Sequence, residues 1–598
     1  MHNSIKVLII LLVVFAGTTV FLALRLERGI IPDEPSYHFP VSKLYATTWG
    51  IPADTPETYQ FRYLGHRPFL YHWINGRILN AAQAIFPDLS DWRKLVLLRL
   101  TSVFYSLGTL LFTYKLAGEY IYNKWGQVFV VFLLANTLMF AFISSGVNYD
   151  NLVNLCCSAG LYFLTRVVKG KDFYRNSFAW ISIIAFGTLV KSTVLPLAAI
   201  MTLSWAVYIA INRKFINFNI RPNFQFYLTI FFLILLLIGN LAIYGVNTVK
   251  YGSLTPDCDQ ILTQEQCENN ALFVRSQEID STKNSLTVQN VIEGEGPDPI
   301  SYFSDYWVPS MSKMIFGITG HKRFNPPDLM ISLYRLVFLA SILSAFKFWK
   351  TPSYPLGSLY AVFAFYTLVL FTTNYQTEMW SGFAHIAIQG RYIFPIIGII
   401  YILTTYFLLD IPNPSVRRAV FSFTVFLYLI NGPAVILTRP GSVTLPGRNI
   451  PKEEPVGELT NQVIIAQEFV SECRGTITEV NLMLATYGRT NTHPVLVRLF
   501  DMSNNRIIAE HSFSAQSVTD NSWYSIPIPP LSGSFGKTYQ ISLSSPESAP
   551  GNAITVWSSE NGNYYPDGHA LINGERIGSD LKFQYECNQP VITDWLVN

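Results

Sequence analysis

Long apolar runs recur along about the first three quarters of the chain, and they constrain its fold more than any other feature. A helix of about 20 apolar residues crosses the roughly 30 Å hydrocarbon core of a bilayer. We expect about eleven spans, at 7–24, 95–117, 126–144, 151–168, 177–190, 192–211, 225–247, 328–346, 357–373, 392–409 and 419–437. The runs that meet at Lys191 are short and also fit a re-entrant pair. The first run has no clean small-x-small cleavage site after it, so we interpret it as an anchor rather than a signal peptide.

The composition agrees with a membrane protein and excludes several other classes. Of the 598 residues, 50% are hydrophobic and only 14% are charged, whereas a soluble globular protein carries about 25% charged residues. This deficit excludes a soluble enzyme, a disordered chain and a fibrous protein. The formal net charge is only +3, and no basic stripe with interleaved aromatic residues occurs, so the sequence predicts no nucleic-acid partner.

Basic residues in the short loops predict the orientation, because cytoplasmic loops are enriched in Lys and Arg. With a cytoplasmic N-terminus and eleven spans, one set of basic residues falls on the cytoplasmic side. The set is Lys6, Lys124, Lys169, Lys171, Arg175, Arg213, Lys214, Arg221, Lys347, Lys350, Arg417 and Arg418. The outer side then receives 25–94, 145–150, 248–327, 374–390 and everything after 438. We expect a multi-pass protein of the inner (cytoplasmic) membrane with an extracytoplasmic C-terminal domain.

Four of the six cysteines fall on the expected outer side, where an oxidising compartment permits disulfides. They are Cys258, Cys267, Cys473 and Cys587. The first pair would close a small loop, and the second pair would join the start of the C-terminal domain to its end, which is worth roughly 4–5 kcal/mol in the chain-entropy model. Cys156 and Cys157 lie inside a span and are expected to pack as small apolar residues. No CxxC or paired-His spacing favours a metal site.

From about residue 458 the long apolar runs stop and short alternating segments begin. They lie at 476–484, 495–500, 507–513, 523–528, 539–543, 554–557 and 581–585, with turn-forming clusters between them. This pattern is typical of antiparallel strands. The sequence therefore predicts an all-α membrane bundle over 1–437, a Pro- and Gly-rich linker at 438–457, and an all-β sandwich or jelly roll over 458–590.

Aromatic residues of the expected sandwich offer surfaces on which a sugar can stack. They are Trp523, Tyr524, Trp557, Tyr564 and Tyr565. For Trp523 and Trp557 a place in the sandwich core is the favoured interpretation.

Two adjacent carboxylates, Asp33 and Glu34, stand where the first span leaves the membrane. One interpretation is a helix start, with Asp33 as the N-cap and Glu34 favoured by the helix dipole. The other is a catalytic base at the membrane surface, near apolar walls that raise the pKa of a carboxyl group. His38 follows Glu34 by four residues and shares its face if a helix starts here. Asp150, at the start of the fourth span, fits either a helix cap or a second carboxylate of the same site.

Basic and aromatic residues gather on the same side of the membrane. Arg forks bind phosphate, and the alternative for each residue is an interfacial anchor. Lys191 lies between two apolar runs, where an ionisable group is costly and indicates a functional site by default. Arg391 follows Gly390 at the outer end of the tenth span. The remaining candidates are Arg62, Arg67, His66, Tyr71 and Tyr392.

These residues, in this order, resemble the GT-C superfamily of integral-membrane glycosyltransferases. The layout is similar to its protein O-mannosyltransferase and aminoarabinose-transferase branch: Pro32-Asp33-Glu34 after the first span, the aromatic segment 68–73, and Asp150-Asn151 opening a later span. The segments 32–38, around Lys191, 250–252 and 389–392 look closer still to a bacterial family of uncharacterised predicted membrane proteins of GT-C type. The resemblance covers about residues 1–437, and Arg67-Pro68 departs from the Pro-Pro of many relatives.

The resemblance implies a polyprenyl-phosphate sugar as donor and a glycan, lipid or protein as acceptor, with transfer on the extracytoplasmic face. Asp33 would be the general base, with Glu34 as the alternative that the sequence leaves open, and the anomeric carbon would be inverted. The donor phosphate would be bound by Arg391 and Lys191, with Arg62 or Arg67 behind them. Further roles in orienting the base or the substrate would fall to Glu34, Asp150, His38, His66, Tyr71 and Tyr392. Some GT-C relatives use a divalent cation and others do not, and no cluster of ligands in the sequence decides this.

Two other functions stay open on the sequence. A lipid-linked glycan polymerase or ligase would use the same chemistry with a wider groove. A non-enzymatic transporter or flippase of lipid-linked sugars would be expected to show internal repeats and charges at the bilayer midplane. The acidic residues here cluster at one membrane face, which favours the enzyme.

Overall fold

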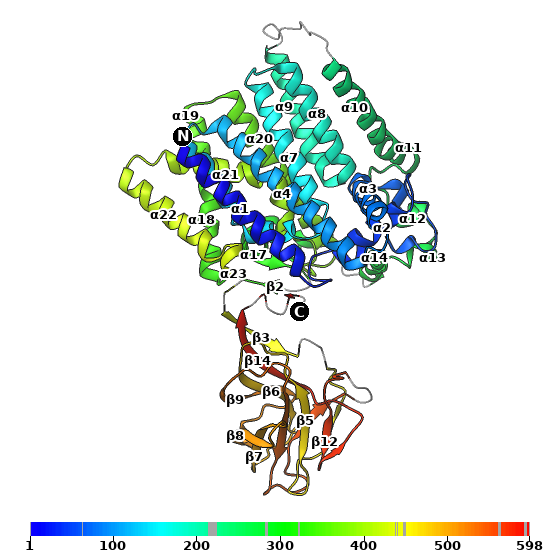
Figure 1. The fold of residues 1–598 in the computed structure, drawn as a ribbon, viewed down its shortest axis with the longest axis vertical. Coiled ribbons are helices and arrows are strands. Elements are labelled where there is room, and N and C mark those ends of the chain that lie inside the picture. The colour runs from blue at the N-terminus through cyan, green and yellow to red at the C-terminus, as the bar shows by residue number, and fades with distance from the viewer. Residues whose placement is uncertain are drawn as a thin grey trace. The chain divides into compact units, whose positions relative to one another are not determined.

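The chain forms two compact units, Met1–Val435 with Trp595–Asn598, and Ile436–Asp594 (Figure 1). The computed structural model describes residues 2–61, 64–212, 224–281, 285–320, 323–436, 438, 440–446, 450–559, 564–590, 592 and 595–596. The first unit is helical and the second is built of β-strands, as expected.

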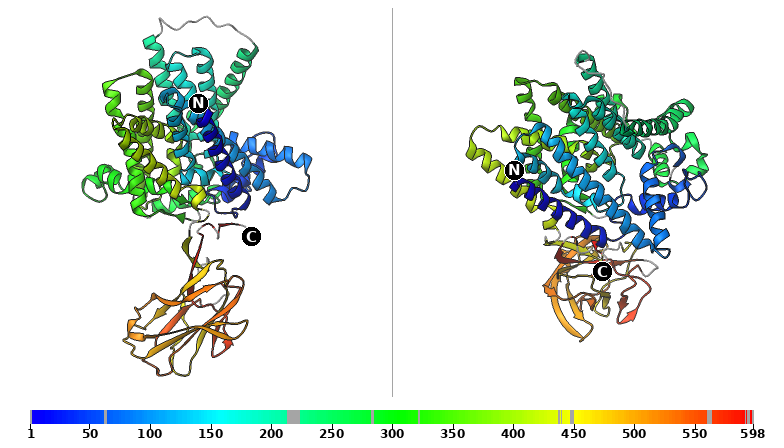
Figure 2. Two further views of the ribbon diagram at one scale, coloured as in Figure 1. Left: turned by 60° about the vertical axis from the view of Figure 1, so that its left-hand side comes forward. Right: turned by 45° about the horizontal axis from the view of Figure 1, so that its top comes forward.

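The helical unit is a bundle of long apolar helices, some of which are continued by shorter ones (Figure 2). They are α1 (His2–Arg25), α4 (Asp91–Tyr120), α5 (Lys124–Ala135), α6 (Leu138–Ser144), α7 (Asp150–Val168), α8 (Phe173–Val190), α9 (Leu195–Asn212), α10 (Phe224–Asn240), α11 (Val246–Tyr251), α18 (Asp328–Leu343), α19 (Ala345–Lys350), α20 (Tyr354–Trp380), α21 (Phe394–Leu409), α22 (Pro414–Ile430) and α23 (Pro433–Ile436).

Nine helical stretches within the described ranges are long and apolar enough to cross a membrane. The consecutive helices α5 and α6, bent by 69° at their junction, bring the number to ten if they form one span. The expected span at 177–190 lies in α8, a continuous 18-residue helix that follows Asp172. The expected class, a polytopic α-helical membrane bundle, is confirmed. The expected number of about eleven spans is close to the nine or ten found among the described residues.

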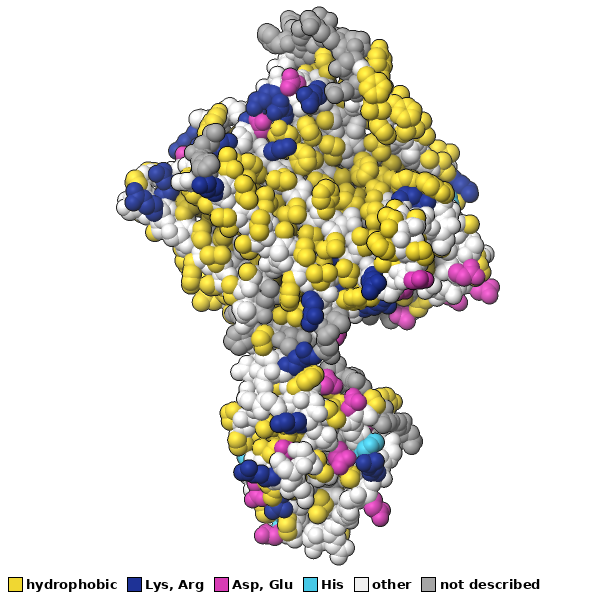
Figure 3. Space-filling view, viewed as in Figure 1, with side chains coloured by type: hydrophobic (Ala, Val, Ile, Leu, Met, Phe, Trp, Pro, Cys, Tyr) yellow, Lys and Arg dark blue, Asp and Glu magenta, His cyan; other side chains and the backbone are white. Residues whose placement is uncertain are grey.

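The surface of the bundle is that of a membrane protein. Apolar side chains cover most of the face in Figure 3, and basic side chains gather at the edge where α19 and α22 lie. On α10 the side chains of Phe231, Phe232 and Ile238 are each more than half exposed. So large an apolar surface is unstable in water and indicates contact with lipid. The direction in which the bundle crosses the membrane stays a prediction.

Short helices fold the long segments between the spans. They are η1 (Glu34–His38), α2 (Phe39–Ala46), η2 (Tyr59–Phe61), η3 (Leu64–His66), α3 (Leu70–Ile85), η4 (Ser192–Val194), η5 (Leu241–Gly245), α12 (Cys258–Ile261), α13 (Gln264–Cys267), α14 (Ala271–Ser281), α15 (Val288–Ile292), α16 (Pro299–Ser301), η6 (Tyr302–Trp307), α17 (Val308–Phe316) and η7 (Gly390–Ile393), with a hairpin of β1 (Ile318–Thr319) and β2 (Arg323–Phe324). The hydroxyl of Tyr59 accepts a 2.9 Å bond from the amide of Gln266, which joins the first long segment to the second.

The β unit is a sandwich of two antiparallel sheets, as expected. Its strands are β3 (Pro440–Leu445), β4 (Glu454–Pro455), β5 (Ile465–Val470), β6 (Thr476–Ala485), β7 (Pro494–Asp501), β8 (Arg506–Ser514), β9 (Ser522–Ser532), β10 (Thr538–Ser544), β11 (Thr555–Ser558), β12 (Ala570–Ile572), β13 (Glu575–Arg576) and β14 (Phe583–Pro590), with η8 (Ala515–Ser517) after β8. One sheet has the order β13-β12-β5-β10-β7-β8, and the other has the order β3-β14-β6-β11-β4 with β9 also paired to β6.

The segment 438–457 is not the free linker that we expected. Residues Pro440–Leu445 form β3, which pairs with β14, and Glu454–Pro455 form β4, which pairs with β11. Both strands lie at an edge of their sheet. Proline and glycine are tolerated at edges because one side of the strand needs no ladder partner, so a Pro- and Gly-rich composition does not distinguish an edge strand from a linker.

Trp523 does not lie in the core of the sandwich, where we expected it. Trp523 lies directly opposite Met483 on the neighbouring strand, and Met483 alternates with the core residues Leu482 and Leu484. Opposite residues share a face of the sheet, so Trp523 projects outward, where it is 39% exposed. Tyr565 is fully buried instead, and its hydroxyl donates a 2.6 Å bond to the carbonyl of Val470.

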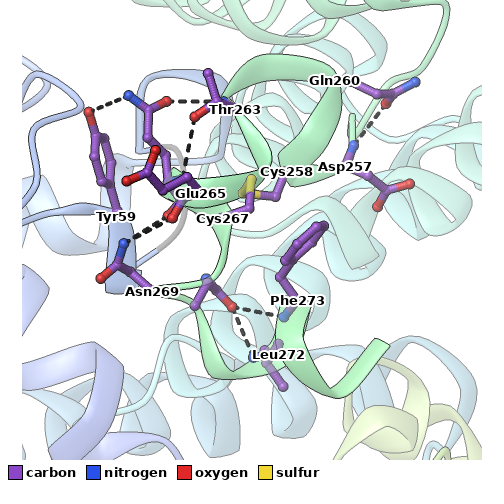
Figure 4. The surroundings of a disulfide bond; sticks show 12 residues. Tyr59, Asp257, Cys258, Gln260, Thr263, Glu265, Cys267, Asn269, Leu272 and Phe273 are labelled. Carbon is purple, nitrogen blue, oxygen red and sulfur yellow. Dashed lines mark hydrogen bonds between the residues drawn. A yellow bond between two sulfur atoms is a disulfide. The ribbon is translucent and has the colours of Figure 1, made fainter. Parts of the chain in front are cut away.

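Both predicted disulfides form. Cys258 and Cys267 join α12 to α13, with 5.9 Å between their Cα atoms (Figure 4). Cys473 and Cys587 join the segment before β6 to β14, inside the hydrophobic core of the sandwich, with 5.6 Å between their Cα atoms. Cys156 and Cys157 are buried and unpaired in α7, as expected.

The loop length of each disulfide predicts its contribution to stability. Cys473–Cys587 closes 114 residues and Cys258–Cys267 closes 9, so the chain-entropy model assigns them about 5 and about 3 kcal/mol. We expect the double variant Cys473→Ser/Cys587→Ser to lower the urea concentration at which half of the sandwich unit is unfolded. Limited proteolysis of the full-length protein at increasing urea concentration measures this midpoint. The variant Cys258→Ser/Cys267→Ser is the control and should leave that midpoint unchanged. An unchanged midpoint in the first variant would contradict the assignment.

Candidate active site

Asp33 occupies an unusual backbone conformation where the chain leaves α1. Its φ of 60° and ψ of −1° lie in the left-handed region, which costs a non-glycine residue about 1 kcal/mol or more. The carbonyl of Asp33 accepts bonds from the backbone N–H groups of Tyr37 and His38, at 3.1 and 2.9 Å. Its side chain makes no capping bond. The carboxylate is therefore directed to other partners, and the helix-cap interpretation does not describe it.

Four charged side chains from four segments meet in one cluster. The Arg391 guanidinium donates to the Asp33 carboxylate at 2.8 Å and lies 3.2 Å from the Asp150 carboxylate. Lys191 donates to the other oxygen of Asp150 at 2.7 Å. Arg391, Lys191 and Asp150 are each at least 91% buried, whereas the Asp33 side chain is 49% exposed. Asp33 is therefore the carboxylate of this cluster whose side chain is open to solvent.

The members of the cluster lie at or next to the ends of helices. Asp150 is the first residue of α7, and Arg391 lies in η7 just before α21. Lys191 is extended between α8 and η4. At Gly390 any side chain would collide with the backbone of Met314 and Ile315 in α17, so glycine alone permits the close contact that fixes Arg391 beside Asp33.

Aromatic rings surround the Lys191 ammonium. It lies 4.3 Å from the centroid of the Tyr149 ring and 4.7 Å from that of Tyr392. Cation–π contacts of this length are favourable, more so when desolvated. The two rings shield the Lys191–Asp150 pair from water, and Tyr392 lies where the sequence places it, beside the expected phosphate ligands.

Glu34 has a different role from its neighbour. It is 1% exposed and makes two bonds with Arg99 of α4, at 2.9 and 2.5 Å. Its carboxylate also accepts a 2.8 Å bond from the backbone N–H of Val147. A carboxylate with these three bonds and no access to solvent is structural, so the expectation that Glu34 takes part in the chemistry is not supported. Arg99 was missed, although an arginine inside an apolar span is itself a signal.

Two histidines form a buried pair next to the cluster. The Nδ1 atom of His38 lies 3.2 Å from the Nε2 atom of His72, and both residues are almost fully buried. Burial lowers the pKa of His38 well below its usual value and lowers the pKa of His72 to about 3. Lys191 and Arg391 add to the shift of His38. Both imidazoles are therefore neutral at pH 7, and Tyr71 and Tyr149 pack edge-on against His38.

Two of the expected site residues, His66 and Arg67, are not in the cluster. His66 bonds to the Asn247 side chain at 3.0 Å, on the side of η5 and α11. Arg67 lines a separate cavity of about 470 Å³ beside Asp257 and Trp380. Arg62 lies outside the described residues. Residues 64–73 therefore contribute to different parts of the unit, because η3 ends at His66 and α3 begins only at Leu70.

The carboxylates of the cluster do not form a metal site. Within the described ranges no three or more His, Cys, Asp or Glu side chains come together in the way that a metal ion requires. Asp33 and Asp150 are instead paired with Arg391 and Lys191. Cationic side chains occupy the positions where a divalent cation would have to bind, so the residues present do not fit one.

Comparison by sequence finds no matching protein-family model and no matching curated protein. Solved structures with a similar fold include ArnT from Cupriavidus metallidurans in the apo state, at 13% identity, over 70% of this chain and 62% of that one, with a TM-score of 0.40. The apo Archaeoglobus fulgidus oligosaccharyltransferase matches at 14% identity over 72% and 55%, with a TM-score of 0.40. Arabinosyltransferase EmbB from Mycobacterium smegmatis matches at 9% identity over 92% and 64%, with a TM-score of 0.38. The matched part is less than two thirds of each of those chains, and the function has to be argued from the residues of this one.

The adjacent carboxylates predict effects of very different size on stability. Glu34→Gln leaves the Arg99 guanidinium charged and buried without a counter-ion, and breaking such a pair costs about 3–5 kcal/mol. Asp33→Asn removes a half-exposed ion pair, which is worth about 1 kcal/mol or less. We expect Glu34→Gln, but not Asp33→Asn, to lower the melting temperature in detergent strongly. Equal melting temperatures for the two variants would show that Glu34 is not structural.

The buried histidine pair predicts that stability falls on acidification. Both pKa values are lowered in the folded protein, so between pH 6.5 and about 3 the unfolded chain binds more protons. Stability is then lost as the pH drops below 6.5, by about 2 kcal/mol at pH 5 for one histidine. We expect His72→Gln to flatten the decline of melting temperature between pH 7 and 5. The control His511→Gln, on a strand of the sandwich, should retain the slope of the unsubstituted protein.

Proposed function

We propose that the protein is a membrane glycosyltransferase that takes a sugar from a polyprenyl-phosphate donor. The observation that carries this proposal is the half-exposed Asp33 carboxylate held by Arg391, with Lys191 and Asp150 behind it, at helix ends on one membrane face. A reactive carboxylate beside buried cations suits a reaction in which a hydroxyl loses a proton while a phosphate gains negative charge. The same order of residues resembles the GT-C superfamily.

The reaction would run in one displacement step. The Asp33 carboxylate takes the proton from a hydroxyl of the acceptor, and that oxygen attacks the anomeric carbon of the donor sugar. A new bond between carbon and the acceptor oxygen forms as the bond to the phosphate oxygen breaks. The electron pair of the broken bond leaves with the polyprenyl phosphate, and the anomeric carbon is inverted. One base suffices, and the enzyme forms no covalent intermediate.

Arg391 and Lys191 are proposed to stabilise the departing phosphate. Buried cations act strongly on a developing charge because they need no reorganisation and little water screens them. The guanidinium has five N–H donors, of which the bond to Asp33 uses one at 2.8 Å and Gln389 accepts another at a long 3.4 Å. Other N–H groups of Arg391 can therefore bind a phosphate while the bond between Arg391 and Asp33 stays intact.

Tyr392, which is partly exposed, is proposed to line the sugar subsite, and the buried His38 and Tyr71 are proposed to support it from behind. They lie against the cluster through Tyr149 and Lys191. His66, which bonds to Asn247, and Arg67, which lines the cavity beside Asp257 and Trp380, are proposed to contact the acceptor. A glycan, a lipid or a protein satisfies the one chemical requirement on the acceptor, a free hydroxyl.

The outer face of the sandwich is proposed as an accessory sugar-binding surface. Trp523 and Trp557 both project from it, and the Lys452 ammonium lies 4.4 Å from the centroid of the Trp557 ring. The Trp557 indole N–H donates to the Asn521 side chain at 2.7 Å. Two indoles fixed on one sheet face present flat apolar surfaces with polar groups beside them.

The two alternative functions differ in what they require of the cluster. A polymerase or ligase of lipid-linked glycans would use the same four residues, and the size of the product distinguishes it. A transporter or flippase would need charges that a substrate meets on its way across the bilayer. Asp150, Lys191 and Arg391 all lie at helix ends instead, which favours the enzyme. With an outward site, the N-terminus would be cytoplasmic.

Loss of the base predicts loss of transfer without loss of donor binding. We expect Asp33→Asn to lower the rate of sugar transfer or donor hydrolysis by about 100-fold or more. Arg391→Lys keeps the charge and loses the fork, and we expect a rate at least tenfold lower. The measurement is product formation by purified protein with polyprenyl-phosphate sugars, and binding of the donor is measured separately.

The matched control is Asp305→Asn, which removes a carboxylate from η6, away from the cluster. Its rate should equal that of the unsubstituted protein. A folded Asp33→Asn variant with unchanged transfer would remove Asp33 from the chemistry. Absence of any donor consumption by the unsubstituted protein, with donor bound, would favour the transporter.

A further inference from the structure

A groove of about 450 Å³ opens on the lipid-facing side of the bundle, between α1, α5, α21 and α22. It contacts α1 near its start, at Val7 and Leu11, and α21 at its last residue, Leu409. The Asp33–Arg391 cluster lies after the end of α1 and before the start of α21. The groove and the cluster are therefore at opposite ends of α1 and of α21, and so at opposite membrane faces if both helices cross the bilayer.

Polar residues line only one end of this groove. Asn123 and Trp125 lie at the start of α5, and Arg417 and Arg418 lie in the first turns of α22. Both helices begin at the membrane face where α21 ends. Trp125 is 54% exposed, as is typical of a tryptophan at the level of lipid headgroups.

The rest of the groove is apolar and follows the helices toward the middle of the bilayer. Phe129 and Phe421 form its floor, with 4.6 Å between their ring centroids. Val425 lies eight residues beyond Arg417, which is about 12 Å along the helix. One leaflet contributes about 15 Å of hydrocarbon, so the groove extends through most of the depth of one leaflet.

The two arginines at the polar end have donors to spare. Arg417 donates once to the carbonyl of Leu409, at 3.3 Å. Arg418 is exposed. The nearest carboxylate along the chain, Asp410, is paired with Lys347 at 2.8 Å. Across the described part of the chain, no ion pair joins a carboxylate to either guanidinium.

We propose that this groove binds one anionic glycerophospholipid. Its phosphate would lie between Arg417 and Arg418, because guanidinium forks match phosphate oxygens. An acyl chain would lie along Phe129, Phe421 and Val425. A basic pocket between membrane helices selects anionic headgroups, since a zwitterionic lipid carries its own cation. The bound lipid would hold together the ends of α1, α5, α21 and α22.

The proposal is tested on the purified full-length protein in detergent. Phosphatidylglycerol and phosphatidylcholine with identical acyl chains are titrated separately, and bound lipid is counted by native mass spectrometry while melting temperature is followed in parallel. We expect phosphatidylglycerol to bind at least tenfold more tightly and to raise the melting temperature. Each basic side chain near the headgroups is worth about fivefold in affinity, so Arg417→Gln/Arg418→Gln should abolish most of that preference.

The control variant removes two exposed basic side chains that do not line the groove, Arg175→Gln/Lys350→Gln, and should keep the preference. Val425→Trp fills the apolar part of the groove and should weaken binding of phosphatidylglycerol at least fivefold with both arginines intact. Equal binding of the two lipids by the unsubstituted protein would overturn the proposal. So would a preference retained in the Arg417→Gln/Arg418→Gln variant. Inorganic phosphate that alone reproduces the thermal shift would show that the site takes the free anion and not a lipid.

Discussion

The buried ion pair of Arg99 and Glu34 is the interaction on which the candidate site depends. The Arg99 guanidinium also donates to the carbonyls of Ala23, Leu26 and Glu27, at 3.3, 2.6 and 3.1 Å. Glu34 accepts from the backbone of Val147. One pair of side chains therefore joins α4, the end of α1, the start of η1 and the turn before α7. Two charges buried in a membrane bundle are tolerated only when both are paired and hydrogen-bonded in this way. Because Asp33 is adjacent to Glu34, the position of Glu34 also fixes that of Asp33.

The neighbouring carboxylates have different surroundings, which suit the two different roles that we propose for them. Glu34 is buried and fully bonded, so it fixes the backbone but cannot exchange a proton with substrate. Asp33 has the adjacent position with a left-handed backbone, which turns its side chain away from Glu34 and toward Arg391. The strain at Asp33 is of the kind found where a backbone positions a reactive group. The network around Glu34 holds that strained conformation in place.

Features that depend on composition and spacing could be predicted from the sequence. Features that depend on which side chains meet in the folded protein could not. Run length predicted the membrane helices, and the compartment predicted the two disulfides. Asp33 and Glu34 are both acidic and adjacent, so only the side chains that they contact in the folded protein distinguish their environments. Arg99 was within reach, because it stands inside an apolar run. The outward position of Trp523 follows only from the strand register, and the edge strand β3 has the same proline and glycine content as a linker.

Apart from Arg99, which lies inside α4 and is paired with Glu34, the charges of the two candidate sites lie where helices begin or end, and this follows from the bilayer. A charge at the middle of a span has neither water nor headgroups near it, whereas a charge at a helix end reaches both. Ionic groups therefore lie at two levels. The Asp33–Arg391 cluster lies beside the end of α1 and the start of α21, and Arg417 with Arg418 lies in the first turns of α22, beyond the end of α21. Between these levels the contacts are apolar and close, as at the rings of Phe15 and Phe140, which lie 5.8 Å apart. A phosphate bound at either face meets arginines that are fixed by helix ends, so the two sites share one structural basis without sharing a ligand.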